Sequence, residues 1–429
     1  MKQYTVRSAK KVAGIIEVPG DKSISHRAVM LGSLARGTTV VSGFLQGEDT
    51  IATLNAFRFM GVEANEKDGK LHIHGRGLFG LKEPDDVLDC GNSGTSMRLM
   101  TGILSGQRFF SVLSGDRYLR NRPMGRVIEP LTKMGACIQG RCRGTKAPLA
   151  IQGGELKGAF YLSPVASAQV KSSLLLAGLY ASGTTEIKEP SLSRDHTERM
   201  FRYFGADIVP HVDGASVRGG RELEGREVMV PADISSAAFF IVAALLVPDS
   251  ELLIVNVGVN PTRTGILDIL LKMGASIELQ NKREVSGEPV ADILVRSSSL
   301  RGIEIGGDLV PRAIDEFPVL CVAAASAEGK TVLRDARELR VKETDRIAAM
   351  AENLTKAGVE VLETEDGMEI TGTDMLQGCL VDSFGDHRIA MSMLIAGLVA
   401  KGEITVTDTD CISTSFPTFL HLLEKVCHL

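Results

Sequence analysis

The sequence of 429 residues contains no tryptophan and only five tyrosines. Proteins that bind single-stranded nucleic acids usually stack the bases on aromatic side chains, so this shortage argues against such a function. The formal net charge of -5 also provides no general attraction for nucleic acid or for an anionic membrane. We therefore expect neither of these partners.

Cysteine pairs and long apolar runs are also missing. The seven cysteines include no CxxC pair, which argues against a disulfide framework and a zinc site and favours reduced thiols in a cytosol. The longest apolar run, Ala237 to Val247, is far shorter than the roughly 20 residues of a membrane span. The N-terminal stretch lacks an apolar signal core. These features predict a cytoplasmic protein.

No group of His, Cys and Asp residues has the spacing of metal ligands. His72 and His74 alternate in HIHG, which is typical of one face of a strand. We therefore expect no metal and no cofactor.

One kind of segment recurs six times along the chain. It has a polar start, an apolar helix rich in Ala and Leu, and then a glycine and a run typical of a strand. The repeats are about 70 residues apart and account for the whole chain. The starting residues are Ser23, Gly94, Ser167, Ser235, Asp315 and Asp386.

A second pattern lies between these segments, at the ends of amphipathic helices, where a glycine stands at the position of a helix C-cap before another strand. These glycines are Gly61, Gly135, Gly205, Gly274 and Gly358. The two patterns together predict an α/β protein made of six strand–helix–strand–helix units, three in each of two domains. The boundary is predicted at Val230-Pro231. We expect residues 19–230 to form one domain, and residues 231–429 together with residues 1–18 to form the other.

The first helix of each repeat is apolar on nearly every face, so we expect it to be buried with only its N-terminal end near water. Several such ends on one surface would form an anion site, because their N–H groups are unpaired. Ordinary N-capping explains Ser235 and Asn92. It does not explain Lys22, Gln169 or Arg388, which are not favoured caps.

Further cationic residues lie near other predicted helix starts. Lys342 and Arg346 are four apart in ELRVKETDRIAAM, which predicts one helical face, with Glu343 rotated by about 100°. Arginine forks suit carboxylate and phosphate, so these groups together indicate small, multiply anionic ligands. The other cationic residues in such places are Arg120, Arg122, Arg126 and Arg194.

Many ordered blocks of the sequence resemble one known family, the bacterial 5-enolpyruvylshikimate-3-phosphate (EPSP) synthases. They are PGDKSISHRA, GNSGT, RPMGRV, ASAQVKS, RDHTE, NPTRTG, IDEFP, RVKETDR, GDHRIAM and TSFP. The resemblance implies two domains, each with three βαβαββ repeats in an inside-out α/β barrel, and an active site in the cleft between them. It also places the N-terminal strand in the C-terminal domain.

The resemblance further implies the reaction. The family transfers the enolpyruvyl group of phosphoenolpyruvate to the 5-hydroxyl of shikimate 3-phosphate and releases phosphate, in the pathway to chorismate and the aromatic amino acids. Asp315 matches the base for the 5-hydroxyl. Glu343 matches the group that protonates the methylene carbon and later removes a proton, and Lys22 neutralises charge or shares the transfer. To act as an acid, Glu343 must be partly desolvated.

The same resemblance implies two sets of binding residues. Shikimate 3-phosphate would be held by Lys22, Ser23, Arg27, Ser167, Ala168, Gln169, Arg194, Asp315 and Lys342. Phosphoenolpyruvate would be held by Lys22, Gly94, Arg122, Gln169, Arg346 and Arg388. We expect these small molecules to be the partners of a monomeric enzyme.

Several positions depart from the family pattern. Thr414 stands where well-known members have a lysine that contacts phosphate, and Glu338 stands where some have an asparagine in the shikimate phosphate pocket. His26 replaces an asparagine, and its role is open. Gly94 is the small residue whose replacement by alanine accompanies glyphosate resistance in some members, so the resemblance implies a glyphosate-sensitive enzyme.

Two alternatives use related folds. The sister transferase that acts on UDP-N-acetylglucosamine carries PGAKNA in its first block and a cysteine on a mobile loop, whereas Cys90 and Cys137 lie in no comparable loop. A non-catalytic protein that binds polyanions or RNA 3′ ends is disfavoured by the negative charge and the few aromatic residues. Phosphate release from phosphoenolpyruvate that depends on shikimate 3-phosphate would separate all three.

Overall fold

The computed structural model describes residues 2–428, which fold into two compact α/β units. The N-terminal unit consists of Gly20–Val230 and the short segment Val285–Glu288. The C-terminal unit consists of the chain up to Pro19, Pro231–Glu284 and the chain from Pro289 onward.

Each unit contains three small sheets of related topology. In the sheet in the middle of the N-terminal unit's sequence, a short edge strand pairs in parallel with its neighbour, and the other two pairings are antiparallel. Its strands are, in spatial order, β6 (Leu88–Asp89), β7 (Phe110–Ser114), β9 (Lys146–Gln152) and β8 (Cys137–Gly140).

The other two sheets of the N-terminal unit have the same order of parallel and antiparallel pairs. One contains β10 (Phe160–Leu162), β11 (Thr184–Lys188), β13 (Gly214–Arg218) and β12 (Asp207–His211). The other contains β14 (Leu223–Glu224), β3 (Ala35–Ser42), β5 (Lys70–Arg76) and β4 (Glu63–Lys67), with β15 (Glu227–Met229) also paired to β3.

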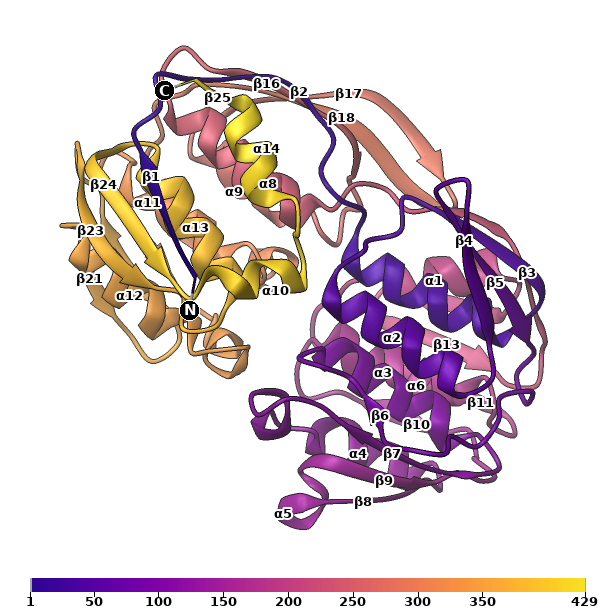
Figure 1. The fold of residues 1–429 in the computed structure, drawn as a ribbon. Coiled ribbons are helices and arrows are strands. Elements are labelled where there is room, and N and C mark those ends of the chain that lie inside the picture. The colour runs from indigo at the N-terminus through magenta and orange to yellow at the C-terminus, as the bar shows by residue number, and fades with distance from the viewer. Residues whose placement is uncertain (1, 429) are drawn as a thin grey trace. The chain divides into compact units, whose positions relative to one another are not determined.

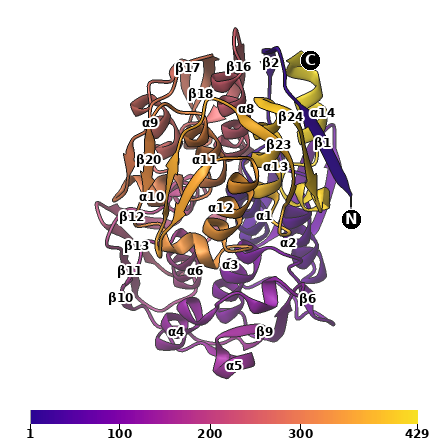
Figure 2. The ribbon, with the colours of Figure 1, turned by 90° about the vertical axis from the view of Figure 1, so that its left-hand side faces the viewer.

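The C-terminal unit takes two of its strands from the start of the chain. β1 (Gln3–Arg7) lies antiparallel to β24 (Ala400–Thr407), where both ribbon views show the indigo N-terminal strand beside the yellow one (Figures 1 and 2). β23 (Leu376–Asp382) completes that sheet. The second sheet contains β17 (Ser276–Val285), β18 (Glu288–Arg296), β16 (Glu251–Gly258), β2 (Lys11–Ile16) and β25 (Cys427–His428). The third sheet contains β19 (Glu304–Ile305), β20 (Lys330–Leu333), β22 (Met368–Thr371) and β21 (Glu360–Glu363).

The six apolar helices predicted from the repeats are all present and buried, which confirms the prediction. In α1 every residue from Ile24 to Leu34 is buried, because the helix packs against the strands β3 and β5 and against neighbouring helices. The six helices are α1 (Lys22–Leu34), α3 (Gly94–Ser105), α6 (Ala168–Gly178), α8 (Ile234–Leu246), α11 (Phe317–Ala325) and α13 (His387–Gly397).

The predicted C-cap glycines are also confirmed. All five have positive φ, between 84° at Gly61 and 106° at Gly135, a conformation that lets the chain leave a helix and enter a strand without a Cβ clash. The helices that they follow are α2 (Glu48–Phe59), α4 (Gly125–Lys133), α7 (His196–Tyr203), α9 (Gly265–Lys272) and α12 (Arg346–Lys356).

Two predicted helix caps are wrong by one or two residues. Asp233, not Ser235, caps α8, because its carboxylate accepts the Ser235 N–H at 2.8 Å. Ser93, not Asn92, caps α3 by accepting the Ser96 N–H. Among the described residues, the structure contains no helix that is long and apolar enough to cross a membrane.

Candidate active site

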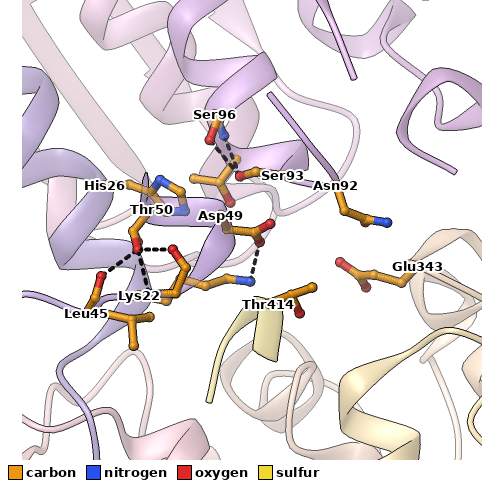
Figure 3. Close-up of polar contacts among 12 residues, drawn as sticks. Lys22, His26, Leu45, Asp49, Thr50, Asn92, Ser93, Ser96, Glu343 and Thr414 are labelled. Atoms are coloured by element: carbon orange, nitrogen blue, oxygen red, sulfur yellow. Dashed lines mark hydrogen bonds and ion pairs between the residues drawn. The ribbon is translucent and has the colours of Figure 1, made fainter. Parts of the chain in front are cut away.

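The start of α1 presents Lys22 beside a buried carboxylate of the next helix. Asp21 caps α1 by accepting the Ile24 N–H at 2.8 Å. Lys22 Nζ then lies 2.6 Å from Asp49 Oδ2, a contact that Figure 3 marks with a dashed line. The Lys22 side chain is 19% exposed. The ammonium group is therefore held in a fixed place near the end of a helix that favours anions.

Arg27 is buried one turn further along α1 and reaches two other helices. Its Nε donates to Thr197 Oγ1 and its second terminal nitrogen donates to Ser172 Oγ, both at 2.7 Å. The first terminal nitrogen donates to the carbonyl of Ser23 at 2.9 Å. Burial lowers the pKa of Arg27 to about 10, so the group stays charged at neutral pH.

The starts of α3 and α6 are joined through Gln169. Its amide nitrogen donates to Thr95 Oγ1 at 3.0 Å, and its amide oxygen accepts from Arg98 at 2.5 Å. Arg98 also donates to the carbonyl of Pro123, directly after Arg122. One buried arginine thus links α6 to the segment that carries Arg122.

Arg98 was missed in the sequence analysis. It lies four residues after Gly94 in a helix expected to be buried, and its side chain is 1% exposed. An arginine within such an apolar helix was the available signal, because a buried charge requires partners.

Ser167, Ala168 and Arg194 lie on segments that adjoin each other. Ser167 precedes α6, and its N–H donates to Glu189 Oε1 at 2.9 Å. Arg194 lies in the loop between β11 and α7 and is partly exposed. Both positions can therefore present polar groups to a ligand.

In the C-terminal unit, Arg346 joins three carboxylates. Its guanidinium lies 2.8 Å from Asp386, 2.7 Å from Glu343 and 3.3 Å from Asp315, while its side chain is 2% exposed. Burial alone would lower the pKa of Arg346, but these three carboxylates raise it. Asp386, which starts one of the six predicted repeats, was not expected to pair with Arg346.

Lys342 and Arg388 contact the same aspartate. Lys342 Nζ lies 3.8 Å from Asp315 Oδ1, and Arg388 donates to the Asp315 carbonyl at 3.0 Å. Burial lowers the pKa of Lys342, despite the opposing effect of Asp315.

The expectation that Lys342 and Arg346 share a helical face is wrong. Asp345 caps α12 by accepting the Ala348 N–H, so the helix begins at Arg346. Lys342 has extended backbone geometry and follows the 3-10 helix η2 (Arg337–Val341). Glu343 nevertheless reaches Arg346 from the turn that precedes the helix.

The expected residues thus divide between the two units, and we treat them as two groups. The first lies in the N-terminal unit and contains Lys22, Ser23, Arg27, Gly94, Arg122, Ser167, Ala168, Gln169 and Arg194. The second lies in the C-terminal unit and contains Asp315, Lys342, Glu343, Arg346 and Arg388. The first group offers cations and hydroxyls, and the second combines cations with carboxylates that can transfer protons.

Two of the departures from the family pattern have definite places. Thr414 ends the 3-10 helix η3 (Thr409–Thr414) and donates to the Cys411 carbonyl at 2.8 Å. Glu338 lies in η2. Within residues 2–428, no three His, Cys, Asp or Glu residues are grouped to hold a metal ion.

Comparisons with known proteins agree on one family. A family model described as EPSP synthase (3-phosphoshikimate 1-carboxyvinyltransferase) matches residues 6–423. Proteins named 3-phosphoshikimate 1-carboxyvinyltransferase from Geotalea uraniireducens and Geobacter metallireducens are 72% and 71% identical to this chain, over 99% of each chain.

Solved structures show the same relationship. EPSP synthase from Acinetobacter baumannii is 49% identical and superposes with a TM-score of 0.89, over 100% of this chain and 98% of the other. The enolpyruvyl transferase NikO from Streptomyces tendae is 16% identical with a TM-score of 0.77, over 98% of this chain and 96% of the other. The latter likeness concerns the fold alone.

Proposed function

Because the chain belongs to the EPSP synthase family, it is a carboxyvinyltransferase of aromatic amino acid biosynthesis, and we propose that the two groups of residues described above carry its reaction. The enolpyruvyl group of phosphoenolpyruvate passes to the 5-hydroxyl of shikimate 3-phosphate, and inorganic phosphate leaves. Both groups act on the same pair of substrates.

The cations of the N-terminal unit fit the charges of the substrates. Arg27, Ser167 and Arg194 bind shikimate 3-phosphate, and Arg122 binds phosphoenolpyruvate beside Gly94. Lys22 lies at a helix start and faces both ligands. Support comes from the helix N-termini and the fixed side-chain contacts, which together favour multiply charged anions.

The carboxylates of the C-terminal unit move the protons. Asp315 removes the proton of the 5-hydroxyl as that oxygen attacks C2 of phosphoenolpyruvate, and Glu343 protonates the C3 methylene to give a methyl group. In the resulting tetrahedral intermediate, Glu343 takes a proton back from that methyl group as the C–O bond to phosphate breaks, and the proton held by Asp315 passes to the departing phosphate. The product then carries the new enol ether.

Arg346 connects the two proton-transfer groups to the donor. Its guanidinium contacts both Glu343 and Asp315. An anionic donor that draws the guanidinium toward itself weakens the contact with Glu343 and leaves that carboxyl group available for proton transfer. This arrangement around Arg346 is the observation that carries the proposal.

The decisive experiment measures phosphate release from phosphoenolpyruvate by the purified protein. We expect release with shikimate 3-phosphate and none with UDP-N-acetylglucosamine, with the enol ether product identified by NMR. Release with the nucleotide sugar, or with neither acceptor, would contradict the proposal. We further propose that the enzyme is a monomer in the cytoplasm, which light scattering and cell fractionation would test.

A further inference from the structure

Three buried ionisable side chains lie behind the residues assigned to shikimate 3-phosphate, and the reaction does not use them. They are Lys171 on α6, Glu189 directly after β11 and Glu198 on α7, here called the Lys171 cluster. Lys171 Nζ lies 3.0 Å from Glu189 Oε2 and 2.8 Å from Glu198 Oε1, and the three side chains are 0%, 0% and 3% exposed. Because burying charges is costly even when they are paired, such a cluster adds little stability by itself.

Glu189 holds two backbone segments in place. Its carboxylate accepts the Ser167 N–H at 2.9 Å and the Ser193 hydroxyl at 2.7 Å. Lys171 completes the arrangement by donating to the Ser193 carbonyl at 3.3 Å. The cluster therefore fixes Ser167 itself and the residue immediately before Arg194.

The same helices also orient Arg27. Ser172 follows Lys171 and Thr197 precedes Glu198, and their hydroxyls are 2.7 Å apart. Arg27 donates to both hydroxyls. The positions of α6 and α7, which the Lys171 cluster joins, thus determine where this guanidinium lies.

We propose that the Lys171 cluster positions Ser167, Arg194 and Arg27 for shikimate 3-phosphate without touching the substrate. Full burial of Lys171 and Glu189 leaves them no surface through which to reach a ligand. Their role is to fix the geometry of groups that do contact it, and small displacements of such groups weaken binding strongly. The inference rests on the proposed function, because it assumes that these residues bind that substrate.

The test replaces Lys171 by methionine, which keeps most of the side-chain volume and removes the ammonium. We expect the Kd for shikimate 3-phosphate, measured by calorimetry, and its KM to rise by about tenfold, whereas kcat at saturation and the KM for phosphoenolpyruvate change by less than about twofold. The matched control is Lys133→Met, which removes an exposed lysine paired with Glu129 in the same unit. We expect the Kd, KM and kcat values of this control to equal those of the unmodified enzyme.

A second variant, Ser193→Ala, covers the case in which Lys171→Met does not fold. It removes only the hydroxyl contact with Glu189, and we expect a smaller rise in the same Kd, with the variant still folded at the assay temperature. An unchanged Kd for shikimate 3-phosphate in a folded Lys171→Met variant would overturn the inference. If Lys171→Met does not fold, an unchanged Kd in Ser193→Ala would overturn it. In either case, turnover by the wild-type enzyme would still support the proposed function. Equal rises in both KM values would also overturn the inference, since they indicate a general structural defect. Absence of wild-type turnover would overturn both proposals.

Discussion

A Cβ atom on Gly94 would lie 2.9 Å from the guanidinium carbon of Arg122. It would also lie 2.8 Å from a terminal nitrogen of Arg98. Both contacts are closer than side chains normally tolerate, so glycine at this helix start is what allows the two guanidinium groups to occupy their places. The absence of a side chain at Gly94 therefore helps to set the position of Arg122 in the proposed phosphoenolpyruvate site.

Gly94→Ala is therefore expected to displace Arg122 and to raise the KM for phosphoenolpyruvate by about tenfold, because a displaced guanidinium loses its alignment with the donor. The KM for shikimate 3-phosphate should change much less. Steady-state kinetics with each substrate varied in turn would measure both values. Inhibition by glyphosate should weaken in the same variant if the inhibitor occupies the donor site.

The matched control is Gly154→Ala, where a Cβ would have no neighbour within 4 Å. Its kinetic constants should equal those of the unmodified enzyme. A donor KM that stays constant in Gly94→Ala would show that Arg122 does not depend on this contact.

Arg122→Ala is expected to weaken donor binding directly. The substitution removes a fork that can bind a carboxylate or phosphate through two hydrogen bonds, so the donor KM should rise by at least about tenfold. Arg117→Ala, which removes an exposed arginine of the same segment, should leave the constants unchanged. Equal donor KM values in the two variants would remove Arg122 from the donor site.

Glu343→Gln should abolish most turnover while the substrates still bind. The amide keeps the shape and can still accept from Arg346, but it cannot exchange a proton with the methylene carbon. We expect kcat to fall by about 10²–10⁴-fold, the usual contribution of a positioned acid or base. In deuterated water, incorporation of deuterium into the methylene group should fall in parallel. Rapid incorporation by this variant would assign the carbon proton to another residue.

The repeats made the fold predictable, because burial and backbone geometry leave direct marks on a sequence. Apolar runs marked the six buried helices, and glycines such as Gly61 marked helix ends that need positive φ. The contacts of Arg98 and Asp386 were not predictable in this way. They depend on which helices become neighbours in space, and the sequence does not encode that proximity locally.

The error at Lys342 and Glu343 has a similar origin. Spacing of four residues suggested one helical face, but the Asp345 carboxylate captures the Ala348 N–H and starts the helix only at Arg346. An aspartate before a helical pattern is a cap signal, and here it competes with the spacing rule. The contact between Glu343 and Arg346 survives because a turn brings the two side chains together.

His26 supplies a prediction about stability and pH. Its Nδ1 lies 2.8 Å from Thr53 Oγ1, which in turn lies 2.6 Å from Ser96 Oγ, so the imidazole joins α1 to α2 and α3. Burial and the nearby charges of Lys22 and Arg27 hold the pKa of His26 well below its usual range. The folded protein therefore keeps this imidazole neutral under conditions in which an unfolded chain takes up a proton.

The sign of the effect follows from proton uptake. Below a pH of about 6.5 the unfolded chain binds a proton at this residue and the folded chain does not, so acidification favours unfolding by at most about 1.4 kcal/mol per pH unit. In His26→Asn this contribution is absent. Thermal unfolding would be measured between a pH of about 7.5 and a pH of about 5.5. The loss of stability over this range should be smaller in His26→Asn than in the unmodified protein. In the control His421→Asn, which replaces an exposed histidine, the loss of stability should be closer to that of the unmodified protein. Identical pH dependence in His26→Asn and the unmodified protein would mean that His26 takes up its proton equally well in the folded state.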